Sequence, residues 1–133
     1  MLDPRLLRTD LDAVRDNLAR RGFALDAAAF QSLEDRRKAV QVRVEELRGE
    51  RNARSREIGK LKASGQEVAT LMAAVKALGD EQADLEAQLE TLQGVLQDLQ
   101  LGLPNLLLAD VPDGRDEAAN VEVRRWGAPR AFD

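Results

Sequence analysis

The sequence predicts an all-α protein with short N-terminal helices, a long antiparallel two-helix coiled-coil hairpin, and a C-terminal loop with a short strand segment. Two observations carry this prediction. Apolar residues recur at alternating spacings of three and four over two long runs, which is the heptad pattern of a coiled coil. Aromatic residues make up only 3% of the chain, whereas 44% is hydrophobic and 33% is charged. That balance is typical of long helices that pack through narrow aliphatic seams.

The N-terminal segment carries two helix-start signals. Asp3 before Pro4 suits a helix start, because the Asp side chain can cap free N–H groups and proline at the first position loses only an unpaired N–H. Thr9 with Asp12 three residues later is a second capping signal, and Gly22 suits a left-handed C-terminal cap. These signals predict helices over about residues 4–8 and 10–21.

Two heptad runs follow, separated by one break. Of their 21 seam positions, 17 are apolar. The residue numbers of seam partners in an antiparallel hairpin should add to a constant, and Leu61 with Val68 and Phe30 with Leu99 both add to 129. One turn near residues 64–65 satisfies every layer, which predicts arm helices over about 27–63 and 67–103. The seam positions are 30, 33, 37, 40, 44, 47, 51, 54, 58 and 61, then 68, 71, 75, 78, 82, 85, 89, 92, 96, 99 and 103.

The C-terminal part differs in character from the hairpin. Pro104 ends the second arm helix, and residues 111–114 indicate a turn or loop. Residues 120–126 alternate apolar and charged side chains, which predicts a short strand. A lone strand is unstable, so we expect it to dock against a sheet outside this sequence. The predicted division is a helical domain over 1–103 and a connector over 104–133.

Composition excludes several classes of function. The chain has no Cys and no His, which excludes disulfides, zinc sites built from these residues, thiol nucleophiles and imidazole bases. We expect no catalytic and no metal-ligating residues. Apolar stretches fall far short of the roughly 20 residues of a membrane span, and the N-terminus lacks a secretory signal pattern. We therefore expect a cytoplasmic protein with no membrane partner.

Charge is divided unequally between the two arms, although the chain as a whole carries only −4. Residues 36–62 hold ten bases and four acids, whereas residues 66–100 hold one base and seven acids. Opposite charges at the e and g positions beside a seam often fix antiparallel pairing, which is one explanation. The other is that the basic arm binds a polyanion.

The outer half of the first arm presents a face without acids. With the seam as a and d, its bases and short polar residues fall at e, b and f, whereas Glu50 and Glu57 fall at g on the other flank. Cations, short polar donors and glycines suit a phosphate backbone, although a solvated face would give the same pattern. The candidate contacts are Arg48, Asn52, Ser55, Arg56, Lys60 and Lys62, with Lys38, Arg43 and Lys76 as weaker candidates.

Two arginines stand in the seam itself. Arg51 and Arg54 face Leu78 and Val75 in the predicted pairing, which is an unusual place for a cation. One interpretation is a polar layer that sets the register and reaches acids such as Glu81. The alternative is that these side chains curl outward to a phosphate.

Several segments match a known family in order and spacing. In residues 50–62, Arg56 stands at the position where this family usually has Lys. Residues Leu103-Pro104-Asn105-Leu106 are similar to the family's Ile-Pro-Asn-Leu. On these matches the chain resembles, over its whole length, the N-terminal domain of bacterial-type seryl-tRNA synthetases. The matching segments are residues 2–8, 21–23, 50–62, 103–106, 111–114, 116–117 and 120–127.

The resemblance implies a role. In that family the arm protrudes from a class II catalytic domain and holds the long variable arm of serine tRNA, typically across a homodimer. The partners implied are therefore tRNA(Ser), the catalytic domain and a second subunit, with no DNA. The family's catalytic motifs lie beyond Trp126, so we expect no aminoacylation by this chain. ATP and Mg²⁺ would belong to the catalytic domain, with no cofactor in this chain.

Two alternatives remain open from the sequence. A coiled-coil hairpin can serve as a protein-interaction or spacer module. The chain can also be a free-standing paralogue of the synthetase arm.

Overall fold

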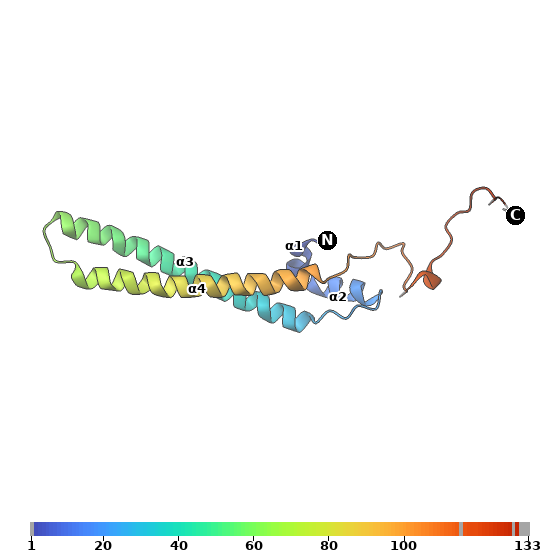
Figure 1. Ribbon diagram of the computed structural model, residues 1–133, viewed down its shortest axis with the longest axis horizontal. Coiled ribbons are helices and arrows are strands. Elements are labelled where there is room, and N and C mark those ends of the chain that lie inside the picture. Colours follow the sequence, from blue (N-terminus) through green and yellow to red (C-terminus); the bar gives the residue numbers. More distant parts are fainter. Residues whose placement is uncertain (1, 115, 129, 131–133) are drawn as a thin grey trace. The chain divides into compact units, whose positions relative to one another are not determined.

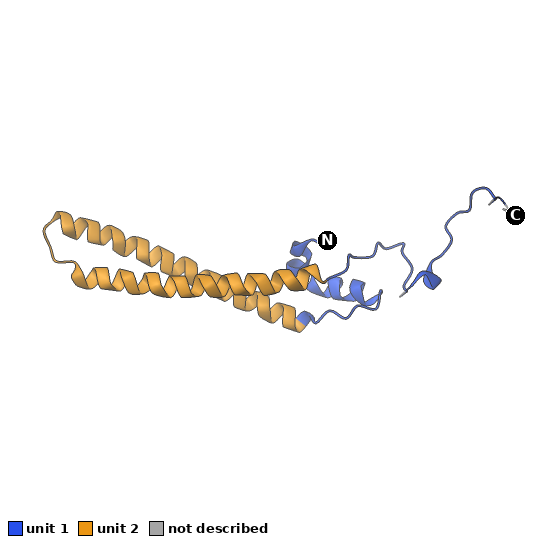
Figure 2. Cartoon of the chain, viewed as in Figure 1, with its two compact units in different colours: residues 1–27, 103–133 blue, residues 28–102 orange. Residues whose placement is uncertain are grey.

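The computed structural model describes residues 2–114, 116–128 and 130, and the chain divides into two compact units. One unit holds the residues up to Ala27 and the described residues from Leu103 onward, and the other holds Ala28–Gly102 (Figure 2). We call them unit 1 and unit 2. All regular structure in the described residues is helical. The elements are α1 (Pro4–Thr9), α2 (Leu11–Ala19), α3 (Ala27–Ala63), α4 (Ala69–Leu101) and the short 3-10 helix η1 (Glu117–Ala119).

Unit 2 is the predicted hairpin, with α3 and α4 side by side and antiparallel (Figure 1). The 37 residues of α3 span about 55 Å at 1.5 Å per residue. Every predicted seam position is buried or partly buried except Arg51 and Leu99. The heptad assignment is therefore confirmed, and the first arm keeps its predicted bounds. The second arm is two residues shorter at each end than predicted.

The hairpin turn lies where the sequence predicts it. Gly65 has a φ of 71°, in the left-handed region that glycine occupies without strain. Its N–H donates to the Lys62 carbonyl over 3.1 Å, and the Gln66 N–H donates to the Leu61 carbonyl over 3.0 Å. This pattern is a Schellman cap, which satisfies carbonyls at the end of α3 and reverses the chain into the short link before α4.

The capping predictions for unit 1 are partly right. Asp3 accepts from the Arg5 N–H over 2.8 Å, as predicted for the start of α1. The second capping prediction is wrong, because Thr9 still belongs to α1 and donates its hydroxyl to the Arg5 carbonyl. Asp10 caps α2 instead, accepting from the Ala13 N–H over 3.4 Å. A carboxylate at this position outcompetes the hydroxyl one residue earlier.

The predicted cap at the end of α2 is confirmed. Gly22 has a φ of 74°, and its N–H donates to the Ala19 carbonyl over 2.9 Å. The following Phe23 N–H donates to the Leu18 carbonyl over 3.1 Å. These two bonds repeat the Schellman pattern of the hairpin turn. The α2 helix itself ends at Ala19, two residues before its predicted end.

The segment that follows α4 returns to α2 within unit 1. The Asn17 side chain donates to the Leu107 carbonyl over 2.9 Å and accepts from the Leu107 N–H over 2.8 Å. Arg20 pairs with Asp113 at 2.6 Å, and Arg21 donates to the Asn105 carbonyl over 2.8 Å. Asn17 of α2 and the two arginines that follow this helix thus hold residues 105–113 in place.

The predicted strand over 120–126 is wrong. This segment forms no ladder, and Val121, Val123 and Trp126 are 70%, 97% and 89% exposed. Backbone N–H and C=O groups need a neighbouring strand to form a sheet, and none is present among the described residues. Of the predicted connector, residues 115, 129 and 131–133 lie outside the described part of the chain.

None of the helices in the described part of the chain is both long enough and apolar enough to cross a membrane.

Candidate nucleic-acid interface

The face without acids lies along the outer half of α3, towards the hairpin turn. We call its six residues the basic face: Arg48, Asn52, Ser55, Arg56, Lys60 and Lys62. All six side chains are exposed. They occupy the e, b, f and c positions, which are consecutive around the helix, over about 21 Å of axis. The structure therefore presents them as one continuous surface.

The cations of the basic face differ in whether their charge is balanced. Arg48 pairs with Glu45 on its own helix at 3.3 Å and with Glu86 of α4 at 3.2 Å. Among the described residues, Arg56, Lys60 and Lys62 form no ion pair. Their positive charge is not compensated by an acid of the described chain, so they are the cations of the set that are most accessible to an external anion.

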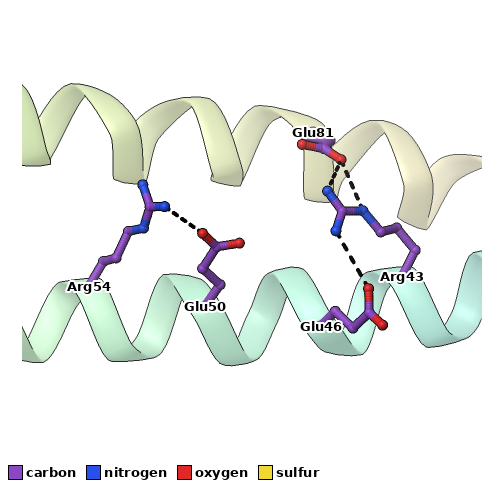
Figure 3. Close-up of polar contacts among 5 residues, drawn as sticks. All are labelled: Arg43, Glu46, Glu50, Arg54 and Glu81. Carbon is purple, nitrogen blue, oxygen red and sulfur yellow. Dashed lines mark hydrogen bonds and ion pairs between the residues drawn. The ribbon is translucent and has the colours of Figure 1, made fainter.

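Two weaker candidates from the first arm lie away from this surface. Arg43 is at a g position and donates to Glu81 of α4 over 2.8 Å, with Glu46 at 3.5 Å (Figure 3). The Glu81 carboxylate raises the pKa of Arg43 above its ordinary value. Lys38 is exposed but lies about 27 Å along the helix from Arg56. Neither residue is part of the basic face.

The e and g positions explain part of the charge asymmetry. Arg43 and Glu81 are both at g, and Arg48 and Glu86 are both at e, so each pair closes one flank of the hairpin. The interpretation of opposite charges as an antiparallel pairing device is therefore correct for these two arginines. It does not account for Arg56, for which the described residues provide no such partner.

The two seam arginines behave differently, and neither contacts Glu81. Arg54 stays on its own helix and pairs with Glu50 at 2.5 Å (Figure 3). Arg51 donates to the Gln82 side-chain oxygen at 3.5 Å. The interpretation that the seam arginines reach acids is correct for Arg54, but the acid is Glu50 rather than Glu81, which pairs with Arg43.

Gln82 connects Arg51 with the e flank. It is a buried seam residue whose amide donates to Glu86 over 2.8 Å. This hydrogen bond is the main cause that lowers the pKa of Glu86, and the charges of Arg48 and Arg51 lower it further. Arg51, Gln82, Glu86 and Arg48 thus form one polar network across the hairpin.

Lys76 of α4 lies at the edge of a groove that the sequence analysis did not identify. The groove has a volume of about 500 Å³ and is also lined by Arg51 and Ser55. A signal for it was present in the sequence, because Gly79 leaves a flank position beside a seam arginine without a side chain. Lys76 thus joins Ser55 of the basic face across the hairpin.

Comparison with known proteins identifies relatives of the whole chain. The family described as the seryl-tRNA synthetase N-terminal domain matches residues 1–107. A serine–tRNA ligase of Methylococcus capsulatus is 55% identical over all 133 residues, and one of Burkholderia multivorans is 53% identical over the same span. The chain covers 31% of the length of each of these relatives.

A solved structure agrees with this relationship. The seryl-tRNA synthetase of Pyrococcus horikoshii, crystallised with ATP, is 30% identical with a TM-score of 0.81. The match covers 96% of this chain and 29% of that one. An all-helical hairpin, the family match over residues 1–107 and relatives above half identity agree with one another. The chain therefore belongs to the seryl-tRNA synthetase N-terminal domain family.

Proposed function

We propose that unit 2 binds tRNA(Ser) through the basic face of α3, chiefly at the phosphate backbone of the long variable arm, as the N-terminal arm of a serine–tRNA ligase. The observation that carries the proposal is that Arg56, Lys60 and Lys62 lie on a helix face without acids and form no ion pair within the described residues. The relatives are named serine–tRNA ligases, which gives the class of RNA.

The chemistry of the face suits an RNA backbone. Lysine and arginine displace counterions from phosphates, whereas Asn52 and Ser55 supply short donors to phosphate or ribose oxygens. Double-helical RNA is recognised mostly by its shape and by phosphate and 2′-hydroxyl contacts. A helix with an exposed basic face of about 21 Å along its axis suits such a duplex.

The rest of the enzyme's work is assigned outside this chain. We propose that ATP and Mg²⁺ are held by a catalytic domain beyond these 133 residues, and that the arm acts within a homodimer. The present chain should then show no serine-dependent exchange of pyrophosphate into ATP. Measurable exchange by the purified chain would overturn this assignment.

The test is a titration of the chain with two RNAs, followed by fluorescence anisotropy. One is tRNA(Ser), and the other is a tRNA with a short variable arm, each at about 50 and about 200 mM salt. We expect tighter binding to the long-armed tRNA and a loss of about tenfold or more at the higher salt, because a few phosphate contacts imply that dependence.

Three other results would contradict the proposal in different ways. Equal affinity for both RNAs removes the variable arm as the target. Binding that is insensitive to salt removes the phosphate contacts. No binding to either RNA favours a protein-interaction hairpin.

A further inference from the structure

A groove between α3 and α4 lies close to the hairpin turn, on the flank that carries Ser55. Its volume is about 500 Å³, and it is open to solvent along one side. Residues Arg51, Ser55 and Ile58 form its α3 wall. Residues Met72, Val75, Lys76, Gly79 and Asp80 form its α4 wall.

Arg51 lines this groove and lies beside Gly79. A Cβ atom at position 79 would lie 3.7 Å from Nε and 3.8 Å from Cζ of Arg51. The arginine leaves the seam on this side and lies beside the glycine. Its single hydrogen bond among the described residues is the 3.5 Å contact to Gln82, so most of its five N–H donors have no protein partner.

The lining of the groove combines three kinds of chemistry. Ile58, Met72 and Val75 are apolar, Arg51 and Lys76 are cationic, and Asp80 is a carboxylate. Inorganic phosphate would use the cations alone, would be repelled by Asp80, and is much smaller than the groove. An apolar peptide side chain would leave both cations unused.

An unpaired nucleotide uses all of these groups. Its phosphate suits Arg51 and Lys76, and its base suits the apolar walls and the plane of a guanidinium group, on which unstacked RNA bases commonly lie. The Asp80 carboxylate can accept from the amino or imino group of a base. The groove is also continuous with the basic face, because Ser55 belongs to both.

We propose that this groove holds one unpaired nucleotide of the RNA that binds the basic face, with its base between the two helices and its phosphate at Arg51 and Lys76. The inference rests on the proposed function and extends it, because the interface then includes α4 and contacts a base as well as the backbone.

The experiment compares two probes with equal numbers of phosphates. Anisotropy measures the affinity of the full chain for an adenosine hexanucleotide and for an abasic RNA of the same length. We expect the base-bearing probe to bind about fivefold tighter or more, because one stacked base contributes that much. Gly79→Leu fills the groove and should bring the ratio to about one, because a base can then no longer enter between the two helices.

Gly94→Leu is the matched control. It makes the same change in the same helix, at a glycine with no atom within 4 Å of its Cβ position. This variant should keep the wild-type ratio. Arg51→Leu provides a second test with little risk to folding, because it places an apolar residue in the seam, and it should also lower the ratio towards one.

The outcomes separate this proposal from the proposed function. A ratio of about one in the wild type overturns the nucleotide site, and the proposed function stands if tRNA(Ser) still binds in a salt-dependent manner. A folded Gly79→Leu or Arg51→Leu chain that keeps the base preference also overturns the site. A base preference that the groove variants abolish supports it, even if tRNA(Ser) shows no preference over a short-armed tRNA.

Discussion

Arginines that look equivalent in the sequence differ in what their charge can do. Arg48 and Arg56 are eight residues apart on the exposed side of one helix, yet Arg48 pairs with two glutamates and Arg56 with none in the described part of the chain. An exposed ion pair adds little to stability, but it removes a charge from competition for phosphate. We therefore expect Arg56 and its lysine neighbours towards the turn to contribute most of the anion binding proposed for this face.

Gln82 offers a test of the polar network at the scale of one residue. Gln82→Leu removes the hydrogen bond that is the main cause of the low pKa of Glu86, so that pKa should rise towards its ordinary value. Carbon-detected NMR titration of the Glu86 carboxyl measures the change. The control Gln88→Leu, at an exposed position of the same helix, should leave the pKa of Glu86 unchanged.

The Gln82→Leu substitution should also change how the free energy of unfolding depends on pH. The folded pKa of Glu86 lies below its unfolded value, so its contribution to stability is present above the unfolded pKa and is lost as pH falls through the folded pKa. Thermal unfolding between about pH 6 and pH 3 should therefore decline less steeply in Gln82→Leu than in the wild type. An equally steep or steeper decline would contradict the role of Gln82.

The partners of individual charged side chains were the hardest feature to predict from the sequence. The heptad positions limit the candidate ion pairs to e and g, yet the choice of Glu81 by Arg43 depends on side-chain conformations across two helices. The position of Arg51 beside Gly79 likewise involves a residue of the other arm. Neither of these follows from the spacing of residues along one helix.

At the scale of elements, two glycines of α3 and its turn have opposite roles. Gly65 adopts a left-handed conformation at the turn, whereas Gly59 sits inside the helix with no atom within 4 Å of its Cβ position. Gly59→Ala should stabilise the hairpin by up to about 1 kcal/mol through helix propensity. Gly65→Ala should destabilise it by about 1 kcal/mol, because an L-residue is strained there.

Urea unfolding followed by circular dichroism measures both changes. The pair controls for the substitution itself, since both variants add one methyl group to open space. Shifts of the same sign in the two variants would contradict the assignment of Gly65 to the cap.

The helices of the hairpin and its turn were the features that the sequence predicted best. Apolar residues at alternating spacings of three and four determine the buried side of each arm. The residue numbers of facing seam residues add to a constant, which determines the position of the turn. The failures are instructive. A strand over 120–126 needs a neighbouring strand, which the described chain lacks. Asp10 caps α2 in place of the predicted Thr9, because capping side chains at neighbouring positions compete for the same N–H groups.

At the scale of the molecule, distant parts of the chain meet within unit 1. Asn17 makes two hydrogen bonds with the backbone of Leu107, which is ninety residues away. Asn17→Ala should speed hydrogen exchange of the Leu107 amide by about tenfold or more, because it loses its acceptor. Asn52→Ala on α3 should leave this exchange unchanged.

This hydrogen-exchange experiment tests whether Asn17 holds the segment after α4 in place. Fast exchange of the Leu107 amide in the wild type would contradict the two hydrogen bonds between Asn17 and Leu107. Sequence did not predict it, because an asparagine on a short helix gives no sign of a partner so far along the chain.

The central claim also belongs to the molecule, since a chain of net charge −4 is proposed to bind a polyanion through one local face. The most direct test compares Arg56→Glu with Arg36→Glu, an equal charge change at an exposed position of the same helix about 30 Å away. Affinity for tRNA(Ser) should fall about tenfold at low salt in Arg56→Glu, with a flatter salt dependence, and change little in Arg36→Glu. Equal losses in the two variants, or no loss in Arg56→Glu, would contradict the claim that this face of α3 holds the RNA.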